Sequence, residues 1–335
     1  MSKIGTITDP TGDYTITQEL VHKLDPEEVF LTNWRRTGPD SFTVAARWPA
    51  DQPFYRAADG EYEPLLVTET VRQLFPLLCH VGYGTPFGHH LVWEGYHYEL
   101  APHALSGRDG PVMLELRVVC SDIVHRRSQL AALTMDVDVL RDGIPVARAH
   151  SRFTVQAPAV YSRLRGANAD SAGAMAAAPP AAAPISARYS GRPDPADVVL
   201  TESTAAGISI SEFPGEFHGA RPGGWWLRVD TTHRKYFDHP VDHAPGMLLL
   251  EAARQAAQAV LHPRPVLPVT MEAGFHRYVE LDAPCRIEAR VLPDGLVRVT
   301  AEQYGQLCFT AEVGTADRPV LATTAGTAGA ADEPG

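Results

Sequence analysis

The sequence GMLLLEAARQAAQAVLH, residues 246–262, is the segment most informative about the fold. It follows Pro245 and stops before Pro263, positions typical of the start and end of a helix. Its interior polar residues share one narrow stripe at i, i+3, i+4 and i+7: Glu251, Arg254, Gln255 and Gln258. Almost every other residue is apolar, as in helices buried against a sheet. We therefore predict a central, wrapped helix whose polar stripe faces either solvent or an internal cleft.

The same pattern occurs a second time, in PLLVTETVRQ at residues 64–73. A shift of 182 residues places Glu69, Arg72 and Gln73 on Glu251, Arg254 and Gln255. An exposed Glu–Arg pair is the simplest reading of such spacing. Because charged residues occur at equivalent sites of two otherwise apolar helices, the pattern favours a functional cleft over a solvated helix face.

Alternating apolar and polar residues follow each helix, the period of half-buried antiparallel strands. In the first half they occupy 112–120, 133–140 and 146–155, and in the second half 285–292, 295–304 and 307–313. Asp-Gly pairs at 142–143 and 294–295 predict hairpin turns. The chain is thus predicted to be an α+β protein in which each half has one long helix followed by antiparallel strands.

The composition divides the chain into five segments. We predict an N-terminal extension (1–25), a first repeat (26–162), a flexible Ala/Pro-rich linker (163–189), a second repeat (190–318) and a disordered tail (319–335). Residues 165–187 contain no aromatic residue, and three prolines argue against the alternative of an alanine-rich helix.

The overall composition excludes several classes. The 335 residues, 44% hydrophobic and 21% charged, are typical of a globular protein, and the net charge of -11 argues against a nucleic-acid partner. No apolar run reaches the roughly 20 residues that span a bilayer, and no signal peptide is visible, so we expect a cytoplasmic protein outside the membrane. The single cysteines at 79, 120, 285 and 308 lack zinc-site spacing, and glycine-rich phosphate loops are missing, so neither metal nor cofactor is expected.

The segment FDHPVDHAPGMLLLEAARQAA, residues 237–257, resembles the β-hydroxyacyl-ACP dehydratases of the hot-dog fold. In those proteins a His-Pro loop leads through Pro-Gly into a central helix with a glutamate and a glutamine. Here His239 is two residues too close to the helix, and Arg254 replaces a small residue. These departures put dehydratase chemistry in doubt.

The differences from the dehydratase pattern match a narrower family. Together with VFLTNWRR (29–36), PLLVTETVRQ and GHHLVWEG (88–95), the segment resembles the A-factor biosynthesis (AfsA-type) γ-butyrolactone synthases, over roughly residues 22–315. The resemblance implies a double hot-dog, two tandem repeats paired face to face as a pseudo-dimer. It also implies an acyltransferase that moves a β-ketoacyl group from an acyl carrier protein (or CoA) thioester to a hydroxyl of dihydroxyacetone phosphate. The phosphorylated ester then closes to a butenolide, a precursor of γ-butyrolactone or furan signalling molecules.

Two alternatives of other classes stay open. One is a hot-dog dehydratase or thioesterase acting on acyl thioesters, and the other is a non-catalytic, acyl-binding regulatory protein. The sequence leaves open whether the chain acts as a monomeric pseudo-dimer or as a homodimer, and which repeat holds the active site.

Acyl transfer to an alcohol needs a base, donors for an oxyanion and a grip on the phosphate. We predict Glu251 or Glu69 as the base; an apolar wall raises a carboxyl pKa and a neighbouring arginine lowers it, so the sign stays open. The backbone N–H groups of Gly246 and Met247, at a helix N-terminus, are predicted to hold the oxyanion.

Guanidinium groups suit a phosphate, so Arg254 and Arg72 are the predicted phosphate ligands, with pairing to their own glutamates as the alternative. Further predicted contacts to substrate are Gln255, Gln73, Asp242, His243 and Arg234. Asp242 and His243 equally fit loop hydrogen bonding, and Arg234, like Lys235, fits a solvated loop. The aromatic residues Trp93, Phe275 and Tyr278 line an acyl tunnel or fill the core.

Overall fold

A computed structural model describes residues 16–57, 59–107, 110–202 and 223–318. The predicted tail 319–335 and the first 15 residues of the N-terminal extension lie outside this part. Within it, one sheet of 12 strands runs in the order β1-β2-β4-β5-β6-β3-β9-β12-β11-β10-β8-β7, and neighbouring strands pair antiparallel. The first six strands belong to the first repeat, and β7 to β12 belong to the second.

The strands of the first half are β1 (Leu31–Gly38), β2 (Ser41–Trp48), β3 (His90–Leu100), β4 (Val112–Arg126), β5 (Gln129–Arg141) and β6 (Ile144–Gln156). Those of the second half are β7 (Leu200–Glu202), β8 (Gly223–Leu227), β9 (Val266–Phe275), β10 (Arg286–Val291), β11 (Val297–Gln303) and β12 (Gln306–Asp317). Two strands precede the helix in each half, so the predicted order of helix first and strands afterwards is incomplete. Pairing of β3 with β9 joins the two half-sheets into one.

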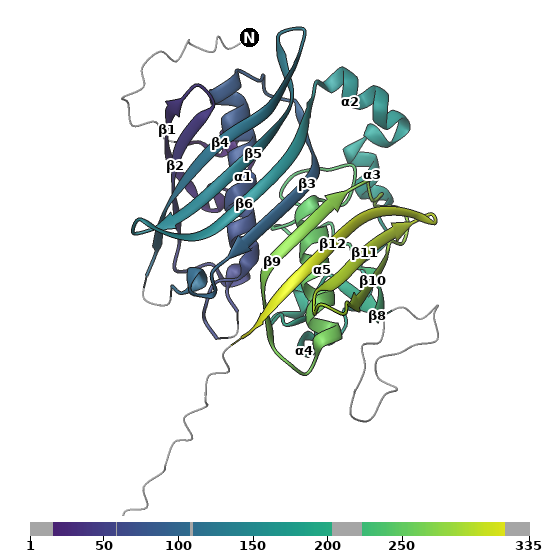
Figure 1. Cartoon of the computed structure of the whole chain (residues 1–335). Helices are drawn as coiled ribbons and strands as arrows, with labels where there is room; N and C mark the ends of the chain where they lie inside the picture. The colour runs from purple at the N-terminus through teal and green to yellow at the C-terminus, as the bar shows by residue number, and fades with distance from the viewer. Residues whose placement is uncertain (1–15, 58, 108–109, 203–222, 319–335) are drawn as a thin grey trace, which may run out of the picture.

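Two long helices, α1 (Pro64–Tyr83) and α5 (Gly246–Leu261), lie side by side on one face of this sheet (Figure 1). Every residue of α5 from Met247 to Gln258 is buried, and so is most of α1. The polar stripes therefore face the interior of the protein. Two half-sheets, each wrapped around its own helix, make the α+β double hot-dog that the sequence predicts.

Proline and glycine set the ends of these helices. Pro64 occupies the first turn of α1, and Gly84 ends the helix at φ 65°, a left-handed conformation that favours glycine. Helix α5 begins after Pro245 and ends before the His262-Pro263 bond. Within the described residues, no helix combines the length and apolar content needed to cross a membrane.

The segment 163–189 differs from the predicted flexible linker. It contains the end of α2 (Pro158–Arg165), the 3-10 turn η5 (Gly166–Ala169), α3 (Ser171–Ala177) and the start of α4 (Ala187–Ser190). Arg165 and Ile185 are buried. The alanines favour helix, and the prolines at 179, 180 and 184 follow α3 without interrupting it. The start of this segment is also held in place because Arg165 binds two carboxylates of the second repeat.

Candidate active site

A cavity of about 400 Å³ lies between the two repeats. Its wall combines the middle of α1, the start of β3, the loop 235–245 and the first turn of α5. Predicted site residues that line it are Glu69, Arg72, Asp242, His243, Gly246 and Met247. Each repeat thus supplies one side of a single composite site.

A cluster of charged groups forms the α1 side of the cavity. Glu69 is buried and accepts two hydrogen bonds of 2.8 Å from Arg72, one from Nε and one from Nη2. Lys23, from the N-terminal extension, places its Nζ 3.3 Å from Glu69 Oε1. Burial alone would raise the pKa of Glu69, but the charges of Arg72 and Lys23 lower it to about 2. Glu69 is thus an anion that holds two cations at the cavity wall.

The first turn of α5 forms the opposite side. Pro245 has no side-chain oxygen to cap the helix, so the N–H groups of Gly246 and Met247 are available to a ligand. A Cβ on Gly246 would lie 2.5 Å from Trp93 Cε3, so only glycine allows the helix to approach this ring. The end of a buried helix dipole reinforces the attraction of these N–H groups for negative charge.

Aromatic rings form the apolar part of the wall. Trp93 stacks on Phe275 with ring centroids 5.1 Å apart, and Phe75 meets Trp93 edge to face. Tyr278 also lines the cavity, so the three predicted aromatic residues face it together. The cavity wall therefore has an apolar part, made of aromatic rings, and a charged part, made of the cluster around Glu69.

The loop before α5 is held by a buried network. Asp242 accepts hydrogen bonds from Tyr161 Oη at 2.7 Å, Arg165 Nε at 2.8 Å and His243 Nδ1 at 2.7 Å. Arg165 also binds Glu280 with both terminal nitrogens. Burial alone would raise the pKa of Asp242, but the hydrogen bonds from His243, Arg165 and Tyr161 hold it well below its usual range.

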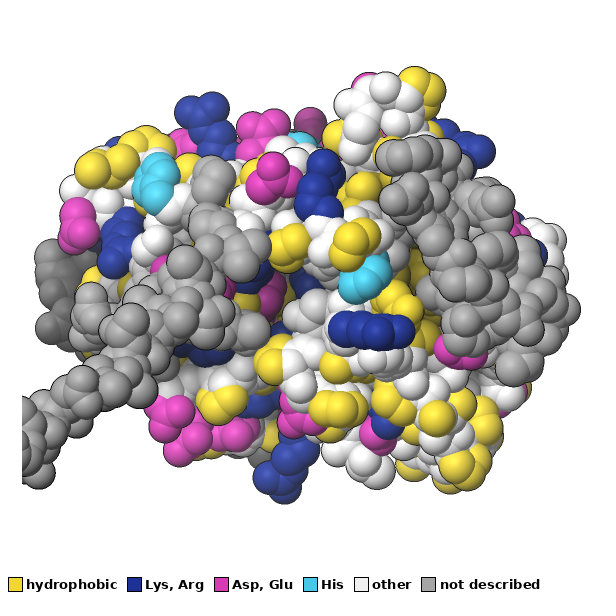
Figure 2. Space-filling model, turned by 90° about the horizontal axis from the view of Figure 1, so that it is seen from below, with side chains coloured by type: hydrophobic (Ala, Val, Ile, Leu, Met, Phe, Trp, Pro, Cys, Tyr) yellow, Lys and Arg dark blue, Asp and Glu magenta, His cyan; other side chains and the backbone are white. Residues whose placement is uncertain are grey.

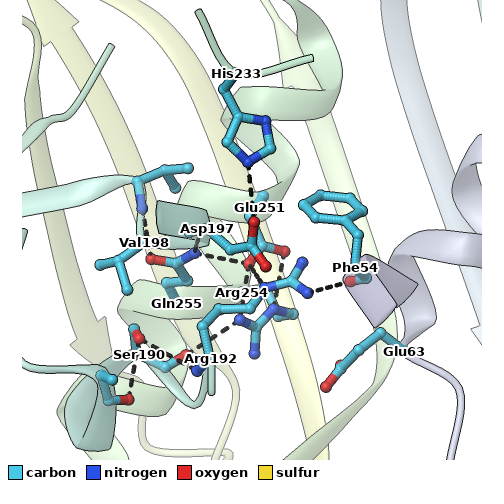
Figure 3. A network of polar contacts seen from close by, with 12 residues as sticks. Phe54, Glu63, Ser190, Arg192, Asp197, Val198, His233, Glu251, Arg254 and Gln255 are labelled. Atoms are coloured by element: carbon cyan, nitrogen blue, oxygen red, sulfur yellow. Dashed lines mark hydrogen bonds and ion pairs between the residues drawn. The ribbon is translucent and has the colours of Figure 1, made fainter. Parts of the chain in front are cut away.

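The equivalent site of the second repeat is closed (Figure 3). Glu251 is fully buried and binds Arg254 Nε at 2.9 Å and Arg192 Nε at 2.7 Å. Arg192 also donates to Phe54 O at 2.6 Å and stacks over that ring. Burial would raise the pKa of Glu251, but Arg192 and Arg254 lower it to about 2. The space beside this cluster is about 10 Å³, room for one water at most.

The helix end facing Glu251 also differs from its counterpart. Pro64 and Leu65 of α1 border the small space, where Gly246 and Met247 border the large cavity. Proline has no N–H, so the first donor found in α5 is missing from α1. Glu251 and Arg254, predicted as base and phosphate ligand, thus lie in a cluster that offers no room for a substrate.

The two predicted glutamines contact the protein's own backbone. Gln73 accepts from Phe30 N at 3.0 Å and donates to Glu28 O at 2.7 Å. Gln255 repeats this with Val199 N at 2.9 Å and Asp197 O at 2.9 Å. Both are fully buried and neither lines the large cavity. They anchor the 3-10 turns η2 (Pro26–Glu28) and η6 (Pro195–Asp197), in place of the predicted contact with substrate.

These turns carry a repeat that the sequence analysis missed. LDPEEVF at 24–30 matches PDPADVV at 193–199, and the residue two places before each aspartate is a cation, Lys23 or Arg192. Lys23 pairs with Glu69, and Arg192 pairs with Glu251. The repeated Asp-Pro is the signal that could have found both cations.

Comparison with known proteins agrees with this tandem arrangement. The pattern of the family described as the A-factor biosynthesis hotdog domain matches residues 8–157 and 173–316. The chain belongs to this family. A Streptomyces virginiae protein called 2-oxo-3-(phosphooxy)propyl 3-oxoalkanoate synthase is 40% identical over 306 residues, covering 90% of this chain and 97% of that one. Proteins of the same name from Streptomyces coelicolor and Streptomyces griseus are 39% and 37% identical, and each covers 87% of this chain and 88% and 92% of its own.

Two solved structures illustrate the matches found among known structures. The 12:0-ACP thioesterase from Umbellularia californica has a TM-score of 0.47 at 10% identity, over 82% of this chain and 98% of that one. The dehydratase domain from the CurF module of curacin polyketide synthase has a TM-score of 0.47 at 12% identity, over 88% and 99%.

The remaining predicted cation, Arg234, is exposed and does not line the cavity of this A-factor-family chain. Its neighbour Lys235 does, and its Nζ contacts Glu28. On the face shown in Figure 2, basic side chains are mixed with acidic and hydrophobic ones. Tyr161 and Arg165, which hold Asp242, were missed because Tyr161 lies next to the segment predicted as a linker and Arg165 lies within it.

Proposed function

We propose that this protein is a 2-oxo-3-(phosphooxy)propyl 3-oxoalkanoate synthase. It moves a β-ketoacyl group from an acyl carrier protein thioester to a hydroxyl of dihydroxyacetone phosphate, and the ester then closes to a butenolide. The observation that carries the proposal is the composite cavity, which is lined by Arg72 of α1 and Lys23 and by the N-terminal turn of α5. Relatives that match the chain over most of its length bear the same name.

The phosphate of the acceptor is proposed to bind Arg72 and Lys23. Arg72 uses Nε and Nη2 for Glu69, which leaves Nη1 for a ligand. Lys23 has only 4% of its side chain exposed, so its charge acts in a poorly solvated place. Two carboxylates, Glu69 and Asp238, lie near these cations, so a phosphate is proposed to bind through charge-assisted hydrogen bonds to the guanidinium and ammonium groups themselves.

The thioester is proposed to lie across the first turn of α5. The N–H groups of Gly246 and Met247 would bind the oxygen of the tetrahedral intermediate, where negative charge develops. The rings of Phe75, Trp93 and Phe275 would receive the acyl chain. The donor is expected to be an acyl carrier protein, with CoA as the alternative carrier.

Glu69 takes a different part from the predicted one. Arg72 and Lys23 lower the pKa of Glu69 and make it a weak proton acceptor near neutral pH, so we propose that Glu69 is not the base. Its part is to position Arg72 and Lys23 for the phosphate. Glu251 holds Arg254 and Arg192 in the same way, and its site has no space for an acceptor.

Both sides of the cavity come from one chain, so we propose that the monomer, as a pseudo-dimer, is competent for the reaction in the cytoplasm. The test is thiol release from a β-ketoacyl thioester, measured with and without dihydroxyacetone phosphate. We expect release to depend on the acceptor and to match the amount of phosphorylated ester formed. Release that ignores the acceptor would instead indicate a thioesterase, and loss of water from a β-hydroxyacyl thioester would indicate a dehydratase.

A further inference from the structure

Two adjacent residues of the cavity wall form an acid–imidazole pair that the function above does not use. His243 Nδ1 lies 2.7 Å from Asp242 Oδ1. The carboxylate side chain is 5% exposed, whereas the imidazole is 30% exposed and lines the cavity. The pair thus has one buried member and one member that a ligand can reach.

The network around Asp242 fixes the orientation of the ring. Asp242 already accepts from Tyr161 Oη and Arg165 Nε, and its low pKa keeps it an acceptor. An ionised carboxylate cannot donate, so the proton of this hydrogen bond belongs to His243 Nδ1. In the neutral ring Nε2 then carries the lone pair, and it can take a proton from a bound hydroxyl.

The groups that face the pair come from three further elements. From α2 these are Tyr161 and Arg165, and from the loop after β9 they are Tyr278, whose ring lies 4.6 Å from that of His243, and Glu280. From the start of β3, His90 stacks on Tyr161. Arg165 neutralises part of the negative charge of Asp242 and Glu280, and its guanidinium lies over the Tyr278 ring.

A second pair in the same loop is built differently. His239 Nδ1 lies 2.5 Å from Asp238 Oδ1, but this imidazole is 47% exposed. Asp238 has Lys23 at 3.7 Å in place of the three donors that hold Asp242. The His239 ring is therefore less constrained and better solvated than the His243 ring.

We propose that His243 is the general base of the acyl transfer and that Asp242 positions it, an inference that rests on the proposed function. Nε2 takes the proton of the acceptor hydroxyl as its oxygen attacks the thioester carbonyl carbon. A C–O bond forms, the C–S bond breaks, and the imidazolium returns the proton to the departing sulfur. The products are the ester and the free thiol, so atoms and charge balance. Tyr161 and Arg165 act through Asp242.

The experiment compares His243→Ala with His150→Ala in steady-state transfer to dihydroxyacetone phosphate. His150 is a matched control because its Nδ1 also lies 2.8 Å from an aspartate, Asp136, on the exposed sheet surface. We expect kcat of His243→Ala to fall by about 10² to 10⁴-fold. The KM values for thioester and acceptor should stay within about threefold. Added imidazole should restore part of kcat, and His150→Ala should behave as wild type.

Three results would overturn the proposal: a kcat within threefold of wild type, a loss confined to the KM of the acceptor, or a loss of kcat that imidazole does not restore. Circular dichroism and thermal unfolding of the variant show that the comparison concerns folded protein. As a second variant, Asp242→Asn should lower kcat less than His243→Ala and should not respond to imidazole. If wild-type enzyme forms no ester, the proposed function fails, and this failure is distinct from that of the histidine assignment.

Discussion

The two repeats carry the same glutamate, arginine and glutamine, yet only Glu69 and Arg72 of the first repeat line the large cavity, whereas Glu251 and Arg254 border a space of about 10 Å³. Around Glu69 the partners leave room: Arg72 is 22% exposed, and the facing helix end offers N–H groups at Gly246 and Met247. Around Glu251, Arg192 fills the space and the facing helix begins with Pro64. In both repeats the glutamine of the polar stripe anchors the helix to the backbone of a neighbouring 3-10 turn. The large cavity lies in the half where the second cation is the shorter Lys23 and the opposite helix begins without proline.

The largest effect should come from removing the anion of the closed cluster. Glu251→Ala leaves Arg192 and Arg254 buried without their carboxylate, and breaking a buried pair in this way costs about 3 to 5 kcal/mol. Chemical denaturation of this variant should show that loss in the free energy of unfolding. The matched Glu69→Ala should lose less stability, because Arg72 reaches solvent. Equal losses would mean that the two sites are equally closed.

The next effect concerns the phosphate. Arg72→Ala should raise the KM for dihydroxyacetone phosphate by about 10 to 100-fold, the value of one charge-assisted hydrogen bond. The KM for the thioester should change little. Arg254→Ala is the control in the other repeat and should lower stability without this selective rise. If the KM for dihydroxyacetone phosphate rose selectively in Arg254→Ala and not in Arg72→Ala, the phosphate site would belong to the second repeat.

The N-termini of α1 and α5 differ in the residue at the first helical position, Pro64 or Gly246. Gly246→Ala places a methyl group against Trp93, and such overpacking costs about 1 to 3 kcal/mol. We expect lower kcat, because the helix end must move away from the thioester. Pro64→Ala, at the corresponding place in α1, should leave kcat within about twofold. An unchanged kcat in Gly246→Ala would remove the first turn of α5 from the reaction.

The dependence of stability on acidic pH should differ least between the two sites. The pKa of each glutamate is about 2 in the folded protein, against an ordinary value of 4.5. A lowered pKa stabilises the fold above the ordinary value, and that stability is lost as the pH falls through 4.5 toward 2. Between pH 7 and pH 4 the loss should be about 1 kcal/mol for each glutamate. Glu69→Gln should remove its share of the pH dependence. A slope unaffected by that change would mean that Glu69 is not ionised and paired.

Much of this organisation can be predicted from sequence. The apolar faces and the polar stripe of 246–262 specify a buried helix, and its repetition at 64–73 specifies the double fold. The spacing places Glu69 beside Arg72 and Glu251 beside Arg254, as found. The position of Gly246 and Met247 at the start of the helix is also predictable, because Pro245 precedes them.

The difference between the sites could not be predicted in this way, because it depends on residues far from either helix in sequence. Arg192 reaches Glu251 from 59 residues away and binds Phe54, which lies in the other repeat. Tyr161 and Arg165 contact Asp242 from a segment that continues into alanine-rich sequence, and that composition predicts a flexible linker in place of a buried contact. The net pKa shift of each glutamate likewise depends on a second cation, Lys23 or Arg192, that helical spacing does not show.

A crystal structure with dihydroxyacetone phosphate bound would show which repeat holds the acceptor. The phosphate should lie against Arg72 and Lys23, with a hydroxyl directed toward the first turn of α5 and His243. Phosphate density beside Arg254, with Arg192 displaced from Glu251, would contradict the assignment of the reaction to the cavity at Glu69.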